Sequence, residues 1–101
     1  MGYLLGLDIG TSQVKALLIT VDGEIVGSAA QEYPLFSPRP GWMEQEPEDM
    51  WQGTVMALRK VLDKYDVDPS EIKAIGLSGQ MHGSVFLANG TKPLRRALLW
   101  N

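Results

Sequence analysis

The sequence predicts an α/β fold in which one helix packs on a mixed β-sheet. Three apolar segments follow one another with only short turns between them, a segment of helical period comes next, and a fourth apolar segment follows it. The composition, with 45% apolar and 21% charged residues in a chain of 101, is that of an ordinary small globular domain. We therefore expect the element order βββαβ, followed by a short hairpin.

The first three strands are expected at residues 3–8, 14–20 and 24–31. Each segment is rich in apolar residues, and the turn signal Val-Asp-Gly at 21–23 separates the second from the third. Connections this short join only antiparallel neighbours, because a parallel crossover needs about a dozen residues or more. The three strands should therefore form an antiparallel meander.

The helix is expected at residues 47–65. Pro47 suits the first helical turn, and Glu48 and Asp49 suit the positive end of the helix dipole. The predicted buried face consists of apolar residues at helical spacing, namely Trp51, Val55, Leu58, Leu62 and Tyr65.

The segment before the helix shows no chemistry of its own. We interpret the acidic run at 44–49 as a solvated helix start, with Glu46 as a weaker helix cap than aspartate would be. Trp42 and Trp51 are interpreted as packing residues of a loop that leads into a core helix.

A fourth strand is expected at residues 72–78, parallel to the first because a helical crossover precedes it. A turn at 88–93 then separates extended pieces at 84–88 and 95–99, which completes a ribonuclease-H-like layer. One helix on four strands leaves the other face of the sheet bare and one edge open. The chain is therefore expected to be an N-terminal fragment of a longer protein that self-associates when isolated.

Composition also excludes several classes of function. A net charge of −3 and a pI near 5.0 argue against nucleic-acid and anionic-membrane partners. No apolar run approaches the roughly 20 residues of a membrane span, and the N-terminus lacks the features of a signal peptide. The absence of cysteine excludes disulfides and fits a cytoplasmic location, and the single histidine, His82, excludes multi-histidine zinc sites.

The stretch LGLDIGTSQVK places a carboxylate where the first strand ends. Asp8 is followed by a turn through Gly10, Thr11 and Ser12, and the returning strand carries Lys15. A carboxylate at the end of a buried strand is costly unless something there needs negative charge. The pattern resembles the first phosphate hairpin of the sugar kinase, actin and heat-shock ATPase superfamily, in which glycine lets the backbone approach phosphate. A plain hairpin with a solvated Asp8 and Lys15 is the alternative interpretation.

A second polar segment, GLSGQMHG, follows the fourth strand. The carboxyl ends of parallel strands are where open α/β sheets bind ligands. A sugar is recognised by directional hydrogen bonds and an apolar wall. Gln80 and His82 can supply the hydrogen bonds, and Met81 and Trp100 can supply the apolar wall. A purely structural histidine is the alternative.

Four segments together carry a family resemblance over essentially all 101 residues: DIGTSQVKALLIT, PGWMEQEPEDMW, IGLSGQMHG and PLRRALLWN. In order and spacing they resemble the FGGY carbohydrate kinases, which belong to the actin, hexokinase and heat-shock ATPase superfamily. Glycerol kinases carry Arg-Glu where Met81 and His82 stand, whereas gluconate kinases share Met-His. The resemblance implies ATP-dependent phosphorylation of D-xylulose to D-xylulose 5-phosphate, with another sugar such as gluconate as the alternative.

The resemblance also implies roles for individual residues. Asp8 corresponds to the aspartate that faces the nucleotide phosphates and contacts Mg²⁺ through water, and Lys15 supplies positive charge to the transferring phosphoryl group. Gly10, Thr11, Ser12 and Lys15 would contact phosphate. Gln80, Met81, His82 and Trp100 would contact the sugar.

Residues 1–101 would then form only the first part of the N-terminal lobe of such a kinase. The general base and the adenosine site of the family lie downstream, so the isolated chain is expected to be inactive, and the full-length protein is expected to be a homodimer. Two non-enzymatic alternatives remain: an actin-like or chaperone ATPase module, and a folding or assembly unit without activity.

Overall fold

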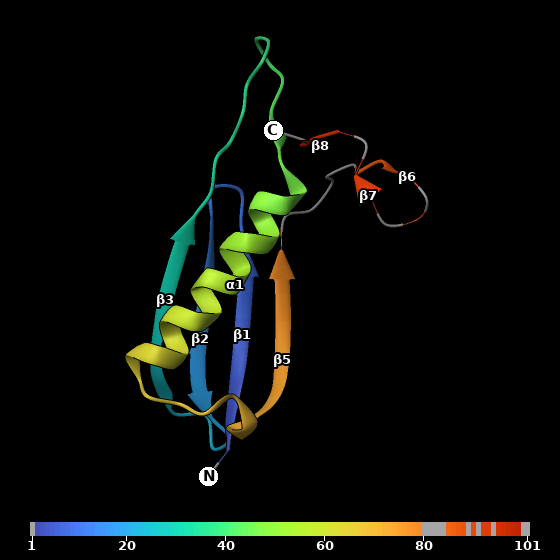
Figure 1. Ribbon diagram of the computed structural model, residues 1–101. Coiled ribbons are helices and arrows are strands. Elements are labelled where there is room, and N and C mark those ends of the chain that lie inside the picture. The colour runs from blue at the N-terminus through green and yellow to red at the C-terminus, as the bar shows by residue number, and fades with distance from the viewer. Residues whose placement is uncertain (1, 80–84, 89, 91, 94, 100–101) are drawn as a thin grey trace.

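The computed structural model describes residues 2–79, 85–88, 90, 92–93 and 95–99 (Figure 1). The five long elements have the predicted order, so the α/β class is confirmed. The elements are β1 (Tyr3–Ile9), β2 (Gln13–Thr20), β3 (Ile25–Glu32), β4 (Glu44–Gln45), α1 (Pro47–Lys64), the 3₁₀ turn η1 (Pro69–Glu71), β5 (Ile72–Gly79), β6 (Leu87–Ala88), β7 (Lys92–Pro93) and β8 (Ala97–Leu98).

The main sheet has the strand order β3-β2-β1-β5. β2 is antiparallel to both β1 and β3, which confirms the predicted meander. β5 is parallel to β1, as the helical crossover requires. The carboxyl ends of β1 and β5 therefore lie at the same edge of the sheet.

The core lies between α1 and the strands that it crosses, β2 and β3, with a lighter contact to β1 (Figure 1). Alternate strand residues face the helix, as the period of two requires. The buried core residues are Leu5, Leu7, Val14, Ala16, Leu18, Tyr33, Ala57, Val61 and Val67.

The helix begins and ends within one residue of the prediction, and its buried face was predicted correctly in part, because Leu58, Leu62 and Tyr65 pack half-buried against the core. The buried helix residues are Gly53, Thr54, Ala57 and Val61, whereas Trp51 is 61% exposed. Small side chains let the helix axis approach the sheet, so the larger apolar residues flank the contact instead of filling it. Trp42, also interpreted as a packing residue, is 43% exposed.

Gly53 marks the closest approach of helix and core. A Cβ atom at this position would lie 2.7 Å from Cδ2 of Tyr33 and 3.6 Å from Cγ1 of Val14. The ring of Tyr33, which is 8% exposed, therefore packs where a side chain of residue 53 would stand.

α1 does not reach β5. Ile75 and Leu77 share the helix face with their partners Leu5 and Leu7, yet they are 53% and 73% exposed. They line an apolar groove of about 660 Å³ between the helix and β5. On the opposite face Leu17 is 37% exposed. The opposite face is bare, as expected, but the helix face is covered only in part, because Ile75 and Leu77 on β5 remain exposed.

The C-terminal strands pair differently from the prediction. The predicted hairpin between 84–88 and 95–99 is wrong in its second arm, because β6 pairs with β7. β8 pairs instead with β4, a two-residue strand too short to show a period in the sequence. The end of the described chain is therefore attached to the segment that precedes α1.

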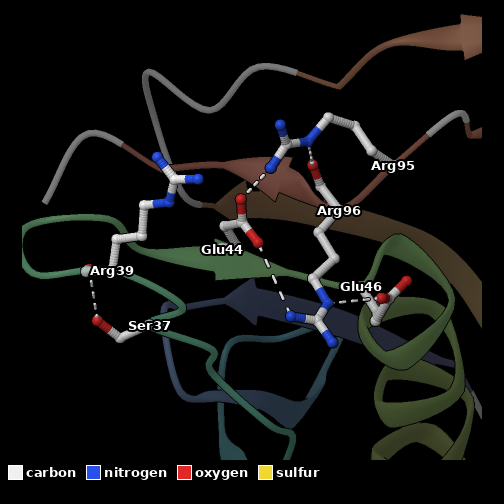
Figure 2. A network of polar contacts seen from close by, with 6 residues as sticks. All are labelled: Ser37, Arg39, Glu44, Glu46, Arg95 and Arg96. Carbon is white, nitrogen blue, oxygen red and sulfur yellow. Dashed lines mark hydrogen bonds and ion pairs between the residues drawn. The ribbon is translucent and has the colours of Figure 1, made fainter.

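An ion-pair network holds this β4–β8 ribbon (Figure 2). Glu44 is 4% exposed and its carboxylate pairs with Arg95, while Nη1 of Arg96 lies 3.8 Å from Oε1 of Glu44. Nε of Arg96 also donates to Oε1 of Glu46 at 2.8 Å, and its guanidinium lies 3.7 Å from the ring centroid of Phe36. The interpretation of 44–49 as a solvated run is wrong for Glu44. The weak capping expected of Glu46 is confirmed, because its side chain makes no capping hydrogen bond.

We predict that Gly53→Ala destabilises the fold, although alanine is the better helix former by about 1 kcal/mol. The added methyl group overlaps the ring of Tyr33, and overpacking of this kind costs about 1–3 kcal/mol. Urea denaturation measures the free energy of unfolding. Gly76→Ala is the matched control, since a Cβ there meets nothing within 4 Å. A Gly53→Ala variant more stable than the wild type would contradict the packing described here.

We predict that removing both arginines of the network costs more stability than removing the carboxylate. Arg95→Gln with Arg96→Gln leaves a buried, unpaired carboxylate, which costs about 3 kcal/mol or more. Glu44→Gln leaves two guanidinium groups whose side chains are 43% and 35% exposed, so water can solvate them and the cost should be about 1 kcal/mol. Thermal and urea unfolding of the two variants give the comparison, and equal losses would argue against burial as the deciding factor.

Candidate functional site

Asp8, Lys15 and Ser78 form a row across three adjacent strands. Asp8 on β1 is in register with Lys15 on β2 and with Ser78 on β5. Paired residues share one face of a sheet, and this face is opposite α1, because the neighbouring Leu7 is buried beneath the helix. The structure thus brings Asp8 and Lys15 together as predicted and adds Ser78. Ser78 was missed by sequence reasoning, although its place at the end of a strand parallel to the first could have indicated it.

The row lines a cavity of about 450 Å³. Gly6 and Gly76, paired across β1 and β5, form its floor, and a Cβ at Gly76 would meet nothing within 4 Å. The absence of two side chains therefore leaves the space open below Asp8. Within the described part of the chain, neither Asp8 nor Lys15 is engaged in an ion pair with another side chain. The cavity thus offers a carboxylate, an ammonium group and a hydroxyl to a ligand.

The turn that joins β1 to β2 lies beside this row. The amide of Gly10 donates to the carbonyl of Gln13 at 2.8 Å, and the amide of Tyr33 donates to the carbonyl of Ser12 at 3.1 Å. A Cβ at Gly10 would lie 3.1 Å from that same carbonyl of Gln13, so glycine permits the tight turn. The predicted phosphate-contact residues Gly10, Thr11 and Ser12 therefore form a compact turn at the edge where β1 and β5 end.

Two side chains from the segment between β3 and α1 hold this turn. The hydroxyl of Tyr33 donates to the carbonyl of Gly10 and lies 3.2 Å from that of Gln13. Burial, with a smaller effect of the charge on Asp8, raises the pKa of Tyr33, so the hydroxyl stays protonated at neutral pH. Gln45 is fully buried, and its Nε2 donates to the carbonyl of Thr11. Sequence reasoning missed both residues, because nothing in a proline-rich loop indicates that its side chains return to a distant turn.

The predicted sugar-binding segment begins at the same edge. β5 ends at Gly79, which pairs with Ile9 directly after Asp8. Gln80, Met81 and His82 follow, and these three residues lie outside the described residues, as does Trp100. The backbone amide of Leu99 donates to the carbonyl of Met43 at 2.9 Å, so the chain leading to position 100 runs beside the segment before α1.

Other kinds of site are not evident in the described residues. They contain no group of three or more acidic, histidine or cysteine side chains that could hold a metal ion together. Their helices do not reach the length and apolarity that a bilayer crossing requires.

Comparison with known proteins agrees with this geometry. Residues 3–101 match the model of the N-terminal domain of the FGGY family of carbohydrate kinases. The chain is 41% identical over its whole length to a xylulose kinase from Bacillus subtilis, and 35% identical over 97% of its length to a glycerol kinase from Thermococcus gammatolerans. It spans about 20% of the length of each of these relatives.

Solved structures give the same result. A xyloylose kinase from Brucella ovis superposes on 98% of this chain with a TM-score of 0.92 and 42% identity, the match covering 21% of that chain. A gluconate kinase from Lactobacillus acidophilus superposes on 98% of this chain and on 20% of its own length, with a TM-score of 0.89 and 28% identity. The chain belongs to the FGGY family of carbohydrate kinases, and its α/β layer has the actin-like ATPase fold of that family.

Proposed function

We propose that this chain supplies the phosphate-binding part of an ATP-dependent sugar kinase. The observation that carries the proposal is the row of Asp8, Lys15 and Ser78 beside the Gly10–Ser12 turn, at the edge where two parallel strands end. Phosphoryl transfer depends mainly on positioning and on neutralising charge, and this edge offers groups for both. Membership of a carbohydrate kinase family supports the same reaction class.

The residues fit a magnesium nucleotide. Asp8 is the one carboxylate among the cavity-lining residues, it is exposed, and no ion pair within the described chain engages it. Mg²⁺ keeps most of its water in nucleotide sites and needs only one or two carboxylates besides the phosphates. When bound, it would supply charge neutralisation at the phosphates. Asp8 would hold its water ligands, Lys15 would neutralise charge on the phosphoryl oxygens, and the turn amides and hydroxyls of Thr11 and Ser12 would donate to them.

The sugar would bind beyond the end of β5, in reach of Gln80, Met81, His82 and Trp100. We propose D-xylulose as the substrate, with gluconate as the second candidate. Xylulose kinases among the relatives and the Met-His pair of the sequence support this choice, and the similar gluconate kinase keeps the alternative open. Turnover of a purified full-length kinase with D-xylulose, gluconate and glycerol, followed by ADP release, decides between them. Nucleotide hydrolysis that no sugar stimulates would favour a non-enzymatic ATPase module instead.

Transfer also needs a base for the sugar hydroxyl, and the described residues offer no credible one. Among the described residues, Asp8 is the only acidic one that lines the cavity, and it is assigned to the metal nucleotide. We therefore propose that residues 1–101 act as the first part of an N-terminal kinase lobe in a cytoplasmic protein and are inactive alone. Exposed Ile75 and Leu77 support the further proposal that the isolated chain self-associates. Light scattering and an ADP-release assay on the isolated chain test both points. A chain that stays monomeric at a concentration on the order of tens of micromolar, about −6 to −7 kcal/mol in association free energy, would contradict the second.

We predict that Asp8→Ala and His82→Ala affect different steps in the full-length kinase. Asp8→Ala should lower turnover and spare sugar affinity, because its target is the metal nucleotide. His82→Ala should lower catalytic efficiency with D-xylulose by about 1–3 kcal/mol, the cost of an unpaired buried polar contact.

Steady-state kinetics with each substrate varied in turn separates these effects. Asp22→Ala is the control for loss of a carboxylate, since Asp22 lies in the exposed turn between β2 and β3, at the opposite end of β2 from the site, and it should leave both parameters unchanged. A collapse of sugar affinity in Asp8→Ala with normal turnover would reverse the assignment, and normal kinetics in His82→Ala would remove that residue from the site.

A further inference from the structure

Three successive carbonyl groups of the β1–β2 turn are bound from one side. The carbonyl of Gly10 accepts from the hydroxyl of Tyr33, that of Thr11 from Nε2 of Gln45, and that of Ser12 from the backbone amide of Tyr33. Only two residues, Tyr33 and Gln45, supply all three donors. Both come from the segment that links β3 to α1.

The direction of these carbonyls fixes the direction of the amides between them. In a planar trans peptide the C=O and the next N–H point in opposite directions, and the described chain has no cis peptide bond. The amides of Thr11 and Ser12 therefore point away from Tyr33 and Gln45. A peptide that turned over would present a carbonyl oxygen, with its negative partial charge, on the side where an amide now stands.

We propose that Tyr33 and Gln45 are positioning residues, which hold the turn so that its amides and not its carbonyls face the phosphates of the nucleotide. The inference rests on the proposed function, because it needs an anionic ligand at this turn. It goes beyond that function in assigning a role to two residues outside the predicted phosphate and sugar contacts. Their contribution is to fix the polarity of the turn before the ligand arrives.

Both donors are held rigidly. Tyr33 is 8% exposed, and its ring packs over Gly53, where a Cβ atom would overlap it. Gln45 is fully buried on β4, where it pairs with Ala97, and the neighbouring Glu44 is fixed by Arg95 and Arg96 (Figure 2). The ion-pair network therefore anchors the strand that carries the amide of Gln45.

The amide of Gln45 is not explained by stability. Its Oε1 is buried and has no hydrogen-bond partner among the described residues. An unsatisfied buried acceptor is destabilising, so an apolar side chain of similar size would serve packing better. The group that the structure uses is the other half of the amide, Nε2, which binds the turn. A bonded Nε2 beside an unbonded Oε1 is expected of a residue that is present to position the turn.

The test uses Tyr33→Phe and Gln45→Met in the full-length kinase, because each variant removes the donor and keeps the shape. Thr54→Val is the matched control, since the hydroxyl of Thr54 is also buried and donates to a backbone carbonyl, that of Met50 at 2.8 Å, within α1. We expect KM for ATP to rise by about 5–30-fold in the two turn variants, as for one lost hydrogen bond near a charged ligand. KM for the sugar should change less than about twofold, and the control should leave both values unchanged.

Stability provides the readout that a merely structural role would not reproduce. Gln45→Met should unfold at the same temperature as the wild type or higher, because it also removes the unsatisfied Oε1, while KM for ATP still rises. Gln45→Glu, which cannot donate to Thr11 as a carboxylate, should raise KM for ATP at least as much. An unchanged KM for ATP in Tyr33→Phe and Gln45→Met, or a loss of stability that tracks the loss of activity in all variants, would overturn the proposal.

A binding measurement separates this inference from the proposed function. Titration of inorganic tripolyphosphate into the ¹⁵N-labelled wild-type protein should shift the amide resonances of Thr11 and Ser12, and the shifts should weaken in Gln45→Met. If the protein phosphorylates no sugar but these shifts occur, the kinase function fails and the positioning role stands. If it phosphorylates sugar and the two variants bind tripolyphosphate as the wild type does, the positioning role fails alone.

Discussion

The pairing of β1 with both of its neighbours is the constraint on which the rest of this structure depends. Since side chains alternate along a strand, the register that buries Leu5 and Leu7 under α1 also places Asp8 on the opposite face. The same register sets Lys15 and Ser78 beside Asp8. A one-residue slip of β1 against β2 would exchange the faces of β1, bury the carboxylate and expose Leu5 and Leu7, and a slip of β5 against β1 would remove Ser78 from the row. Core and site are therefore specified by one set of backbone hydrogen bonds.

Much of this could be predicted from the sequence, because local patterns determine it. Apolar periods, the turn signal at 21–23 and Pro47 locate the long elements to within about one residue, and the short connections dictate the meander. The face of α1 was harder to predict, because burial there depends on which residues are small enough to approach the sheet. Trp51 has the helical spacing of a core residue, but its side chain is too large for the space between the helix and the sheet. The ribbon was missed for a related reason, since two-residue strands such as β4 acquire their pairing only from tertiary contacts.

In the candidate site too, features set by local sequence could be predicted and features set by distant contacts could not. Asp8 and Lys15 could be located from the sequence because a strand–turn–strand pattern brings them together within a few residues. Tyr33 and Gln45 could not, since they contact the turn across more than 20 residues of chain and belong to a loop with no period. The interpretation of Glu44 as solvated failed for the same reason, because its burial depends on Arg95, 51 residues away. The sequence therefore predicts the site residues that lie close together along the chain, but not the distant residues that support them.

The β4–β8 ribbon has a consequence for how this domain folds. The contacts within the meander join residues close in sequence, whereas the ribbon joins residues about 50 apart through two strands of only two residues each. So few contacts cannot meet the entropic cost of closing such a loop before other structure has formed. We expect the ribbon to assemble last, after β5 has paired with β1. The turn beside Asp8 would then exist early as an ordinary hairpin and acquire its contact with Gln45 only at the end of folding. Pulsed hydrogen exchange during refolding would show this as late protection of the Leu99 amide, which donates to the carbonyl of Met43, relative to the β1–β2 amides. Simultaneous protection would exclude such an order.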